Sequence, residues 1–215
     1  MKAWGNKGGI ISIIVIDIGS TSIKSALFAV RKTSAGSSAC EGSAFSVIDS
    51  KDIHQVAMLP NKNPRIFEYS AEEIFAETDK LISNYCQNNR DIEGLVISTQ
   101  MHGCVYPDAA RNMHVYLSWQ DSRCLEPIPG TSESPLDRLS RLLGPEELVP
   151  AGIPVKPALA LANLYAMSCT EPRWKDLYSN MEIFSLGSYL LWRLTGRNIT
   201  HISNAAPMGM ADVRK

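Results

Sequence analysis

The chain has 215 residues and a mass of 23.6 kDa, and 45% of its residues are hydrophobic. This is enough to build the core of one or two globular domains, and it excludes collagen-like, disordered and disulfide-dependent classes. The 21 Lys and Arg residues nearly balance the 22 Asp and Glu residues, for a net charge of -1. A nucleic-acid-binding protein carries a broad basic surface, which this balance excludes, and no membrane partner is indicated. Small-molecule chemistry or protein partners remain.

The cysteines indicate a reducing compartment. They are odd in number and widely spaced, at Cys40, Cys86, Cys104, Cys124 and Cys169. No C-x-x-C pair and no metal-ligand spacing with the four histidines occurs. The apolar run at residues 9–16 is far shorter than the roughly 20 residues that a membrane helix needs, and no cleavage site follows it. We therefore expect a cytoplasmic protein with reduced thiols.

Three strands are predicted in the first quarter of the chain. Residues 10–16 are almost all β-branched, which predicts a strand buried on both faces. A tight connection at residues 17–21 leads to a second strand, residues 22–30. The small, polar residues 32–46 predict a loop, and a third strand follows at about residues 47–58.

The middle of the chain predicts a helix and two further strands. Ser70-Ala71-Glu72-Glu73 is a capping box, and the helix after it has one apolar face. The residues of that face are Ile74, Thr78, Leu81, Ile82 and Tyr85. Residues 94–99 and 115–119 predict strands, each followed by polar residues.

A proline-rich stretch and two more helices complete the chain. Seven of the twelve prolines lie between Pro127 and Pro157, which we interpret as an ordered insertion. Within it Ser134 caps a helix that Pro135 opens and Gly144-Pro145 ends. Its apolar face is formed by Leu136, Leu139, Leu142 and Leu143. Helices are also predicted at about residues 158–168 and 186–195. The result is a mixed α/β or α+β chain with a single sheet.

The connection between the first two strands is a candidate phosphate site. Gly19 lets backbone N–H groups approach phosphate oxygens, and the hydroxyls of Ser20 and Thr21 add donors. Lys24 adds positive charge, and Asp17 can hold a hydrated magnesium ion. It is not a Walker A loop, because the spacing differs and a strand follows. The alternative is an ordinary hairpin turn with a solvated Asp and Lys.

A second candidate site follows the strand at residues 94–99. Ligands commonly bind at strand ends in α/β sheets. Gln100 and His102 can bond the hydroxyl groups of a polyol, while Met101 packs against its carbon skeleton. The alternative is a structural histidine in a turn.

A third candidate site, residues 119–123, offers an aromatic face, an amide, a carboxylate and a guanidinium after a strand. Such a mixture of planar polar groups and a stacking ring suits hydroxyl-rich ligands. The alternative is an internal ion pair between Asp121 and Arg123.

Six motifs in order resemble the N-terminal domain of FGGY-family carbohydrate kinases. They extend from Ile13 to Arg214 and read VIDIGSTSIKSALF, LVISTQMHG, YLSWQDSR, AGIPVKPALALANL, YLLWRLTG and SNAA with the later DVR. Xylulokinases and sedoheptulokinases are the most similar in pattern. The resemblance implies a ribonuclease-H-like, actin-like α/β fold with a mixed sheet flanked by helices. It also implies ATP, Mg²⁺ and a sugar bound between two domains, and γ-phosphoryl transfer to a ketose hydroxyl, the ketose being a pentulose or heptulose.

The resemblance also implies roles for the candidate residues. Asp17 would lie near the magnesium ion. The residues that would face the ATP phosphates are Gly19, Ser20, Thr21 and Lys24. Those that would line the sugar site are Gln100, Met101 and His102. Asp121 and Arg123 would either shape that site or brace it.

The sequence departs from the family pattern in three respects. The family's general base is an aspartate in a glycine-rich segment, expected beyond Lys215 together with the adenosine-binding domain. Residues 1–215 would then form one incomplete N-terminal domain, inactive alone, with an exposed apolar face and possible homo-oligomerisation. Residues 186–189 lack the Lys-Asp pair of many relatives, and the Pro207-Met208-Gly209 stretch is unusual.

Two other functions remain open. One is a non-catalytic protein that senses a sugar or recruits a partner on the same fold. The other is a different actin-like ATPase, such as a chaperone or a cytoskeletal protein.

Overall fold

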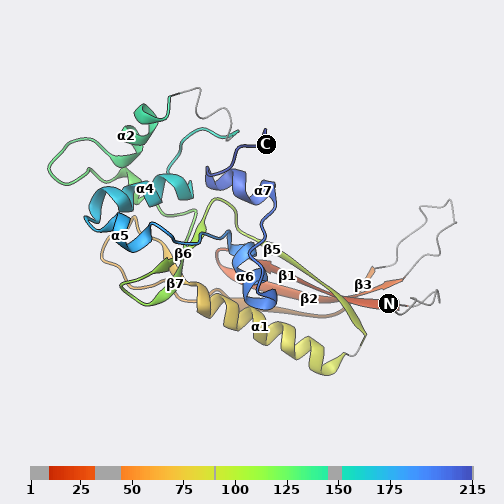
Figure 1. The fold of residues 1–215 in the computed structure, drawn as a ribbon. Coiled ribbons are helices and arrows are strands. Elements are labelled where there is room, and N and C mark those ends of the chain that lie inside the picture. Colours follow the sequence, from red (N-terminus) through yellow and green to blue (C-terminus); the bar gives the residue numbers. More distant parts are fainter. Residues whose placement is uncertain (1–9, 32–44, 90, 145–151, 215) are drawn as a thin grey trace. The chain divides into compact units, whose positions relative to one another are not determined.

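The computed structural model describes residues 10–31, 45–89, 91–144 and 152–214 (Figure 1). Most of the loop predicted at residues 32–46, together with Cys40 and the helix end predicted at Pro145, lies outside these residues. The chain divides into two compact units. Unit 1 comprises Met1–Gln55 and Ala76–Thr99, and unit 2 comprises Val56–Phe75 and Gln100–Lys215.

Unit 1 contains a four-stranded mixed sheet in the order β3-β2-β1-β5. Its strands are β1 (Ile10–Ile18), β2 (Ser22–Arg31), β3 (Phe45–His54) and β5 (Ile92–Thr99). β1 and β2 form an antiparallel hairpin, and β5 runs parallel to β1. These strands confirm the four that the sequence predicts here, although β3 ends earlier than expected.

One face of this sheet is buried and the other is open. The buried side chains of β1 alternate with half-buried or exposed ones, so the prediction of a strand buried on both faces is wrong for the described residues. Ile14 and Ile16 pair with Leu27 and Ser25 of β2 on the buried face. There the Tyr85 hydroxyl lies 3.1 Å from that of Ser25.

Tyr85 belongs to α1 (Ala71–Asn88), which begins in unit 2 and continues in unit 1 (Figure 1). The predicted capping interaction is present, since the Glu73 N–H donates to the Ser70 hydroxyl at 3.1 Å. The predicted apolar face is buried at Ile74, Thr78, Leu81 and Tyr85, and half-buried at Ile82. In the sheet of unit 1, the edge strands β3 and β5 carry exposed apolar side chains. These are Phe45, Val47, Ile48, Leu95 and Val96.

Unit 2 contains a second, three-stranded antiparallel sheet, which corrects the prediction of a single sheet. Its order is β4-β7-β6, with strands β4 (Glu68–Ser70), β6 (Cys104–Asp108) and β7 (Met113–Leu117). β4 and β6 were not expected from the sequence. Short strands depend on their cross-strand partners more than on local preference. Here the partners are β7 for both strands, with further bridges from Met58 to β4 and from Phe184 to β6.

The sequence predicts three of the helices described in unit 2, but not the short ones at residues 174–178 and 202–205. The helices of this unit are α2 (Pro135–Leu142), α4 (Ala160–Thr170), α5 (Trp174–Tyr178), α6 (Leu186–Thr195) and α7 (Ile202–Ala205), with 3₁₀ turns at Arg123–Leu125 and Ala206–Met208. α6 has the predicted bounds, and Gly196 ends it with φ 73°. No helix within the described ranges is long and apolar enough to cross a membrane.

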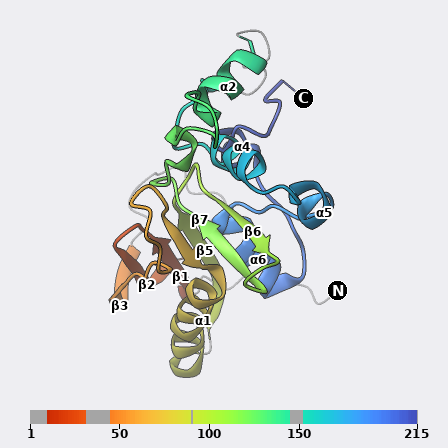
Figure 2. The same ribbon diagram turned by 90° about the vertical axis from the view of Figure 1, so that its left-hand side faces the viewer.

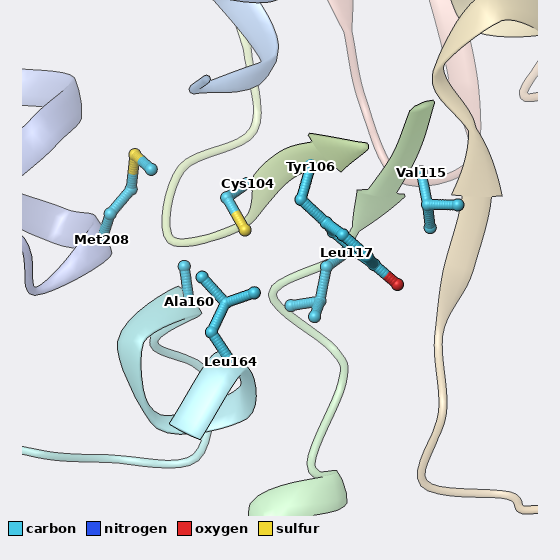
Figure 3. Close-up of a cluster of buried hydrophobic side chains, with 7 residues drawn as sticks. All are labelled: Cys104, Tyr106, Val115, Leu117, Ala160, Leu164 and Met208. Carbon is cyan, nitrogen blue, oxygen red and sulfur yellow. The ribbon is translucent and has the colours of Figure 1, made fainter. Parts of the chain in front are cut away.

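A buried cluster joins the small sheet of unit 2 to its helices (Figure 3). The residues of this cluster are Cys104, Tyr106, Val115, Leu117, Ala160, Leu164 and Met208. They come from β6, β7, α4 and the 3₁₀ turn at Ala206–Met208, segments up to about a hundred residues apart in the sequence. The cluster therefore fixes the ends of β6 and β7 against α4 and this turn.

A second cluster, around Leu139 and Cys124, holds α2. Leu136 and Leu143 pack against it, but Leu142 is 61% exposed, so its predicted place on the apolar face is wrong. Leu139 follows Leu136 by three residues and Leu143 follows Leu139 by four, which keeps all three on one stripe, whereas Leu142 turns away from it.

The helix cap of α2 gives a local test of stability. The Ser134 hydroxyl accepts from the Asp137 N–H at 3.1 Å and donates to its carboxylate at 2.6 Å. Ser134→Ala is expected to lower the free energy of unfolding by about 1 kcal/mol. The control is Ser140→Ala on the exposed side of α2, which should be neutral or slightly stabilising. Urea unfolding measures both, and equal effects would contradict the capping role.

Candidate functional site

The β1–β2 connection of unit 1 is a tight, tethered turn. The Gly19 N–H donates to the Ser22 carbonyl at 2.9 Å, and a Cβ at Gly19 would lie 3.1 Å from that oxygen. Gln55, just after β3, holds the turn from outside. Its side-chain amide donates to the Gly19 carbonyl at 2.7 Å and its N–H donates to the Thr21 carbonyl at 3.1 Å. The turn is thus held in one conformation, and the Gly19 N–H already donates a hydrogen bond within the turn.

The remaining polar groups of this turn are available to a ligand. Within the described residues, the hydroxyls of Ser20 and Thr21 have no hydrogen-bond partner. Asp17 and Lys24 lie opposite each other in the register of β1 and β2, and both side chains are exposed. They line a hollow of about 530 Å³ on the open face of the sheet, together with Val15, Ala26, Phe28 and residues of β3. Of the five residues predicted for phosphate and magnesium, Asp17 and Lys24 thus line one hollow, while Ser20 and Thr21 lie in the adjoining turn and the Gly19 N–H is already bonded.

In unit 2, the hairpin of β6 and β7 brings the other two motifs together (Figure 2). Cys104, the first residue of β6, pairs with Leu117, the last of β7. The segments before Cys104 and after Leu117 are therefore neighbours at the open end of the hairpin. The first carries His102 and the second carries Trp119, which is 42% exposed.

His102 is held in an unusual backbone conformation. Its φ of 70° lies in the left-handed region, which is uncommon for a residue with a side chain. The His102 carbonyl accepts from the Ala160 N–H at 2.9 Å, at the start of α4. Its ring Nδ1 lies 2.8 Å from the Pro207 carbonyl. Strain of this kind persists only where the surroundings hold it, as at ligand-binding sites.

The residues on either side of His102 are also constrained. Gly103 is buried, and a Cβ there would lie 2.4 Å from the Leu117 carbonyl oxygen and 2.8 Å from the Tyr116 ring. The Gln100 Oε1 atom is buried and accepts no hydrogen bond from a described residue. Met101 is 55% exposed.

Asp121 and Arg123 form an internal ion pair. Two nitrogens of Arg123 contact the two carboxylate oxygens of Asp121, at 2.9 and 2.8 Å. The Asp121 carboxylate also accepts from the N–H groups of Phe67 and Arg123. Since the Asp121 side chain is fully buried, its oxygens are occupied within the protein. This arrangement is a brace for the loop after β7.

Glu68 is a third member of this network that the sequence did not reveal. It accepts from Arg123 and Arg111, each at 2.6 Å, and from the Tyr106 hydroxyl at 3.0 Å. Burial alone would raise the pKa of the Glu68 carboxyl, but the charges and hydrogen bonds of Arg123 and Arg111 outweigh burial and hold that pKa below 4.5. Glu68 is 55 residues from Arg123, so no local spacing identifies the pair.

Asn163 on α4 links the network to the second cluster, and it too was missed as a functional residue. Its side-chain amide donates to the carbonyls of Asp121 and Pro157, at 3.0 and 2.7 Å, and its Oδ1 accepts from the Cys124 N–H. With Ala160 bonded to His102, α4 supports both motifs of unit 2. The sequence signal for this supporting role is an asparagine within a helical, alanine-rich motif.

Cys104, a buried free thiol, lies directly after the second motif. Burial raises the pKa of the Cys104 thiol to about 12, which leaves it protonated at neutral pH and a poor nucleophile. Among the residues that the structure describes, no group of three His, Cys, Asp or Glu side chains is arranged to hold a metal ion. Asp17 fits a magnesium ion only as one carboxylate among water or phosphate oxygens, the usual mode for Mg²⁺ with nucleotides.

Comparison with protein families gives one match. Residues 12–215 match the model described as the FGGY family of carbohydrate kinases, N-terminal domain. No curated protein sequence matches the chain significantly.

Solved structures share the fold at low sequence identity. A gluconate kinase from Lactobacillus acidophilus matches 94% of this chain and 36% of its own, with a TM-score of 0.69 and 18% identity. A ligand-bound xylulose kinase from the same organism matches 92% of this chain and 36% of its own, with a TM-score of 0.68 and 18% identity. A carbohydrate kinase from Novosphingobium aromaticivorans has a TM-score of 0.60 and 19% identity, over 93% of this chain and 37% of its own. The chain thus spans little more than a third of these proteins.

Proposed function

Because the chain belongs to the FGGY family of carbohydrate kinases, with the family's actin-like α/β fold, we propose that it is the sugar- and phosphate-binding part of an ATP-dependent ketose kinase. The observation that carries the proposal is the convergence of two motifs at the open end of the β6–β7 hairpin, where polar and apolar side chains are presented on a braced support.

The proposed phosphate site is the β1–β2 turn. Ser20 and Thr21 offer hydroxyl donors, and Lys24 places a cation on the open face of the sheet. Asp17 beside it would hold a magnesium ion through water. The ion and these donors neutralise charge on the phosphates, which is most of what phosphoryl transfer requires of a protein.

The proposed sugar site is the open end of the hairpin. Gln100 and His102 bond hydroxyl groups, while the exposed side chain of Met101 covers carbon. Asp121 and Arg123 act beneath the site, since their charged groups contact each other and Glu68. Phosphoryl transfer also needs a carboxylate base to take the proton of the acceptor hydroxyl, and none of the residues of the two proposed sites is assigned that role.

Calorimetry on the complete protein tests this function with xylulose, sedoheptulose, gluconate and a non-sugar polyol. We expect a ketose to bind in the micromolar to millimolar range that is usual for enzyme substrates. His102→Gln should weaken that binding about tenfold or more, while Ser140→Ala, on α2, should leave it unchanged. No binding by any of the four compounds would contradict the kinase proposal.

Asp17→Asn should affect phosphoryl transfer without affecting sugar binding. It is expected to lower kcat of the complete protein at least a hundredfold, because it removes the carboxylate assigned to magnesium, with little change in sugar affinity. A steady-state assay with calorimetry in parallel measures both. Sugar binding without phosphoryl transfer by the unaltered protein would favour the sugar-sensing alternative.

A further inference from the structure

The ring of His102 has one nitrogen with a fixed hydrogen-bonding role. Its Nδ1 lies 2.8 Å from the Pro207 carbonyl oxygen. A carbonyl can only accept, so the proton of this hydrogen bond is on Nδ1. In a neutral imidazole the other nitrogen, Nε2, then carries a lone pair and can only accept.

The carbonyl that fixes this tautomer is itself held firmly. Pro207 lies in the 3₁₀ turn Ala206–Met208, which Gly209 ends with φ 79° and an N–H donated to the Ala206 carbonyl at 2.9 Å. The next side chain, Met208, is 6% exposed and packs in the cluster with Cys104 and Ala160 (Figure 3).

The backbone of His102 is fixed as well. The Ala160 N–H binds its carbonyl, and Gly103 packs directly against β7. Met208 and Ala160 belong to the same buried cluster, so the donor and the acceptor of the His102–Pro207 bond share one rigid support. The ring therefore cannot rotate to exchange its two nitrogens without breaking that bond.

We propose that the turn Ala206–Gly209 is a positioning element for substrate selection. By holding His102 in the Nδ1–H tautomer, it makes Nε2 an acceptor that selects a hydroxyl group of the substrate. A ketone oxygen or a carboxylate, which has no proton to donate, is disfavoured at that position. This inference rests on the proposed function for its substrate, but the tautomer itself does not depend on it.

The tautomer can be measured directly on the complete protein. Solid-state NMR with ¹³C,¹⁵N-labelled histidine distinguishes the two neutral forms, and the His102 signals are those lost in His102→Asn. We expect the Nδ1–H form without any sugar present. An Nε2–H form or an even mixture would overturn the proposal, whether or not the protein is a kinase.

Two glycines provide a matched pair of variants. Gly209 and Gly196 both have left-handed φ, at 79° and 73°. A Cβ at Gly209 would lie 3.2 Å from Leu161, while none of the neighbouring atoms comes within 4 Å at Gly196. Gly209→Ala is expected to give a mixture of His102 tautomers and to weaken D-xylulose binding at least fivefold. Gly196→Ala, with a similar backbone strain, should change neither.

A third variant keeps the test decisive if Gly209→Ala does not fold. In His102→Asn the side-chain N–H₂ takes the place of Nδ1 and can still bond Pro207, but no acceptor remains at Nε2. It should keep the melting temperature and lose D-xylulose affinity about tenfold. Unchanged affinity would overturn the role of Nε2. Failure of the unaltered protein to bind D-xylulose would count against this substrate, and the tautomer result would still stand or fall by itself.

Discussion

Replacing Arg123 with methionine is expected to lower the free energy of unfolding by about 3–5 kcal/mol. Arg123 neutralises two carboxylates that are almost fully buried, Glu68 at 3% and Asp121 at 0% side-chain exposure. Methionine keeps much of the volume but leaves both carboxylates without their shared cation, and a buried unpaired charge is costly. Urea unfolding of the complete protein, followed by tryptophan fluorescence, measures the loss.

Arg111→Met is the matched control for Arg123→Met. Arg111 also contacts Glu68 at 2.6 Å, but its side chain is 38% exposed, so solvent screens the pair. We expect a loss of about 1 kcal/mol or less. If the two variants lose the same stability, burial does not determine the strength of this network.

The same network predicts a dependence on pH. The pKa of Glu68 is held below its ordinary value of 4.5, so its contribution to stability is fully present above that pH. The contribution is lost as the pH falls through the lower pKa of the folded state, where the carboxylate is protonated. In Arg123→Met this acid-sensitive part should shrink, because only Arg111 of the two arginines that lower the pKa of Glu68 remains.

Gly103→Ala is expected to destabilise the protein by about 3 kcal/mol and to abolish detectable sugar binding. The added Cβ would lie 2.4 Å from the Leu117 carbonyl oxygen, a backbone atom of the paired strand that cannot move alone. The end of β6 must then separate from β7, which moves His102 from the Pro207 carbonyl. Thermal unfolding measures the loss of stability, and calorimetry with the sugar that the unaltered protein binds measures the loss of binding.

Gly94→Ala is the control for this substitution. Gly94 lies in β5, and a Cβ there would meet its nearest neighbour, Ile13, at 3.8 Å, an ordinary contact. Its stability should stay within about 0.5 kcal/mol of the parent. A fully stable Gly103→Ala with normal sugar binding would contradict the close packing of this turn.

Local signals in the sequence were sufficient where an element is determined by its own residues. The bounds of α6 were predicted from its apolar residues and Gly196, and the cap of α2 from Ser134 and Pro135. The β1–β2 hairpin was also predicted, because its strand and turn residues are adjacent in the chain.

Contacts between distant segments could not be predicted in this way. β6 is a strand because β7 and Phe184 pair with it, and the division into two sheets depends on which strands pair. In the site, the Asp121–Arg123 pair was among the alternatives because the two residues are close in sequence, but Glu68 was not considered. The bond from His102 to Pro207 spans 105 residues and leaves no local pattern.

The open end of the β6–β7 hairpin also has a consequence for protein engineering. Met101 and Trp119 are about half exposed, yet Gly103 and Asp121, each two residues further on, are buried in the support beneath. Mutations at the two exposed positions alter what a ligand meets, with little cost to folding, because the buried neighbours keep their contacts. Ligand preference can therefore be redesigned by single substitutions at Met101 and Trp119, with Gly103 and Asp121 left unchanged.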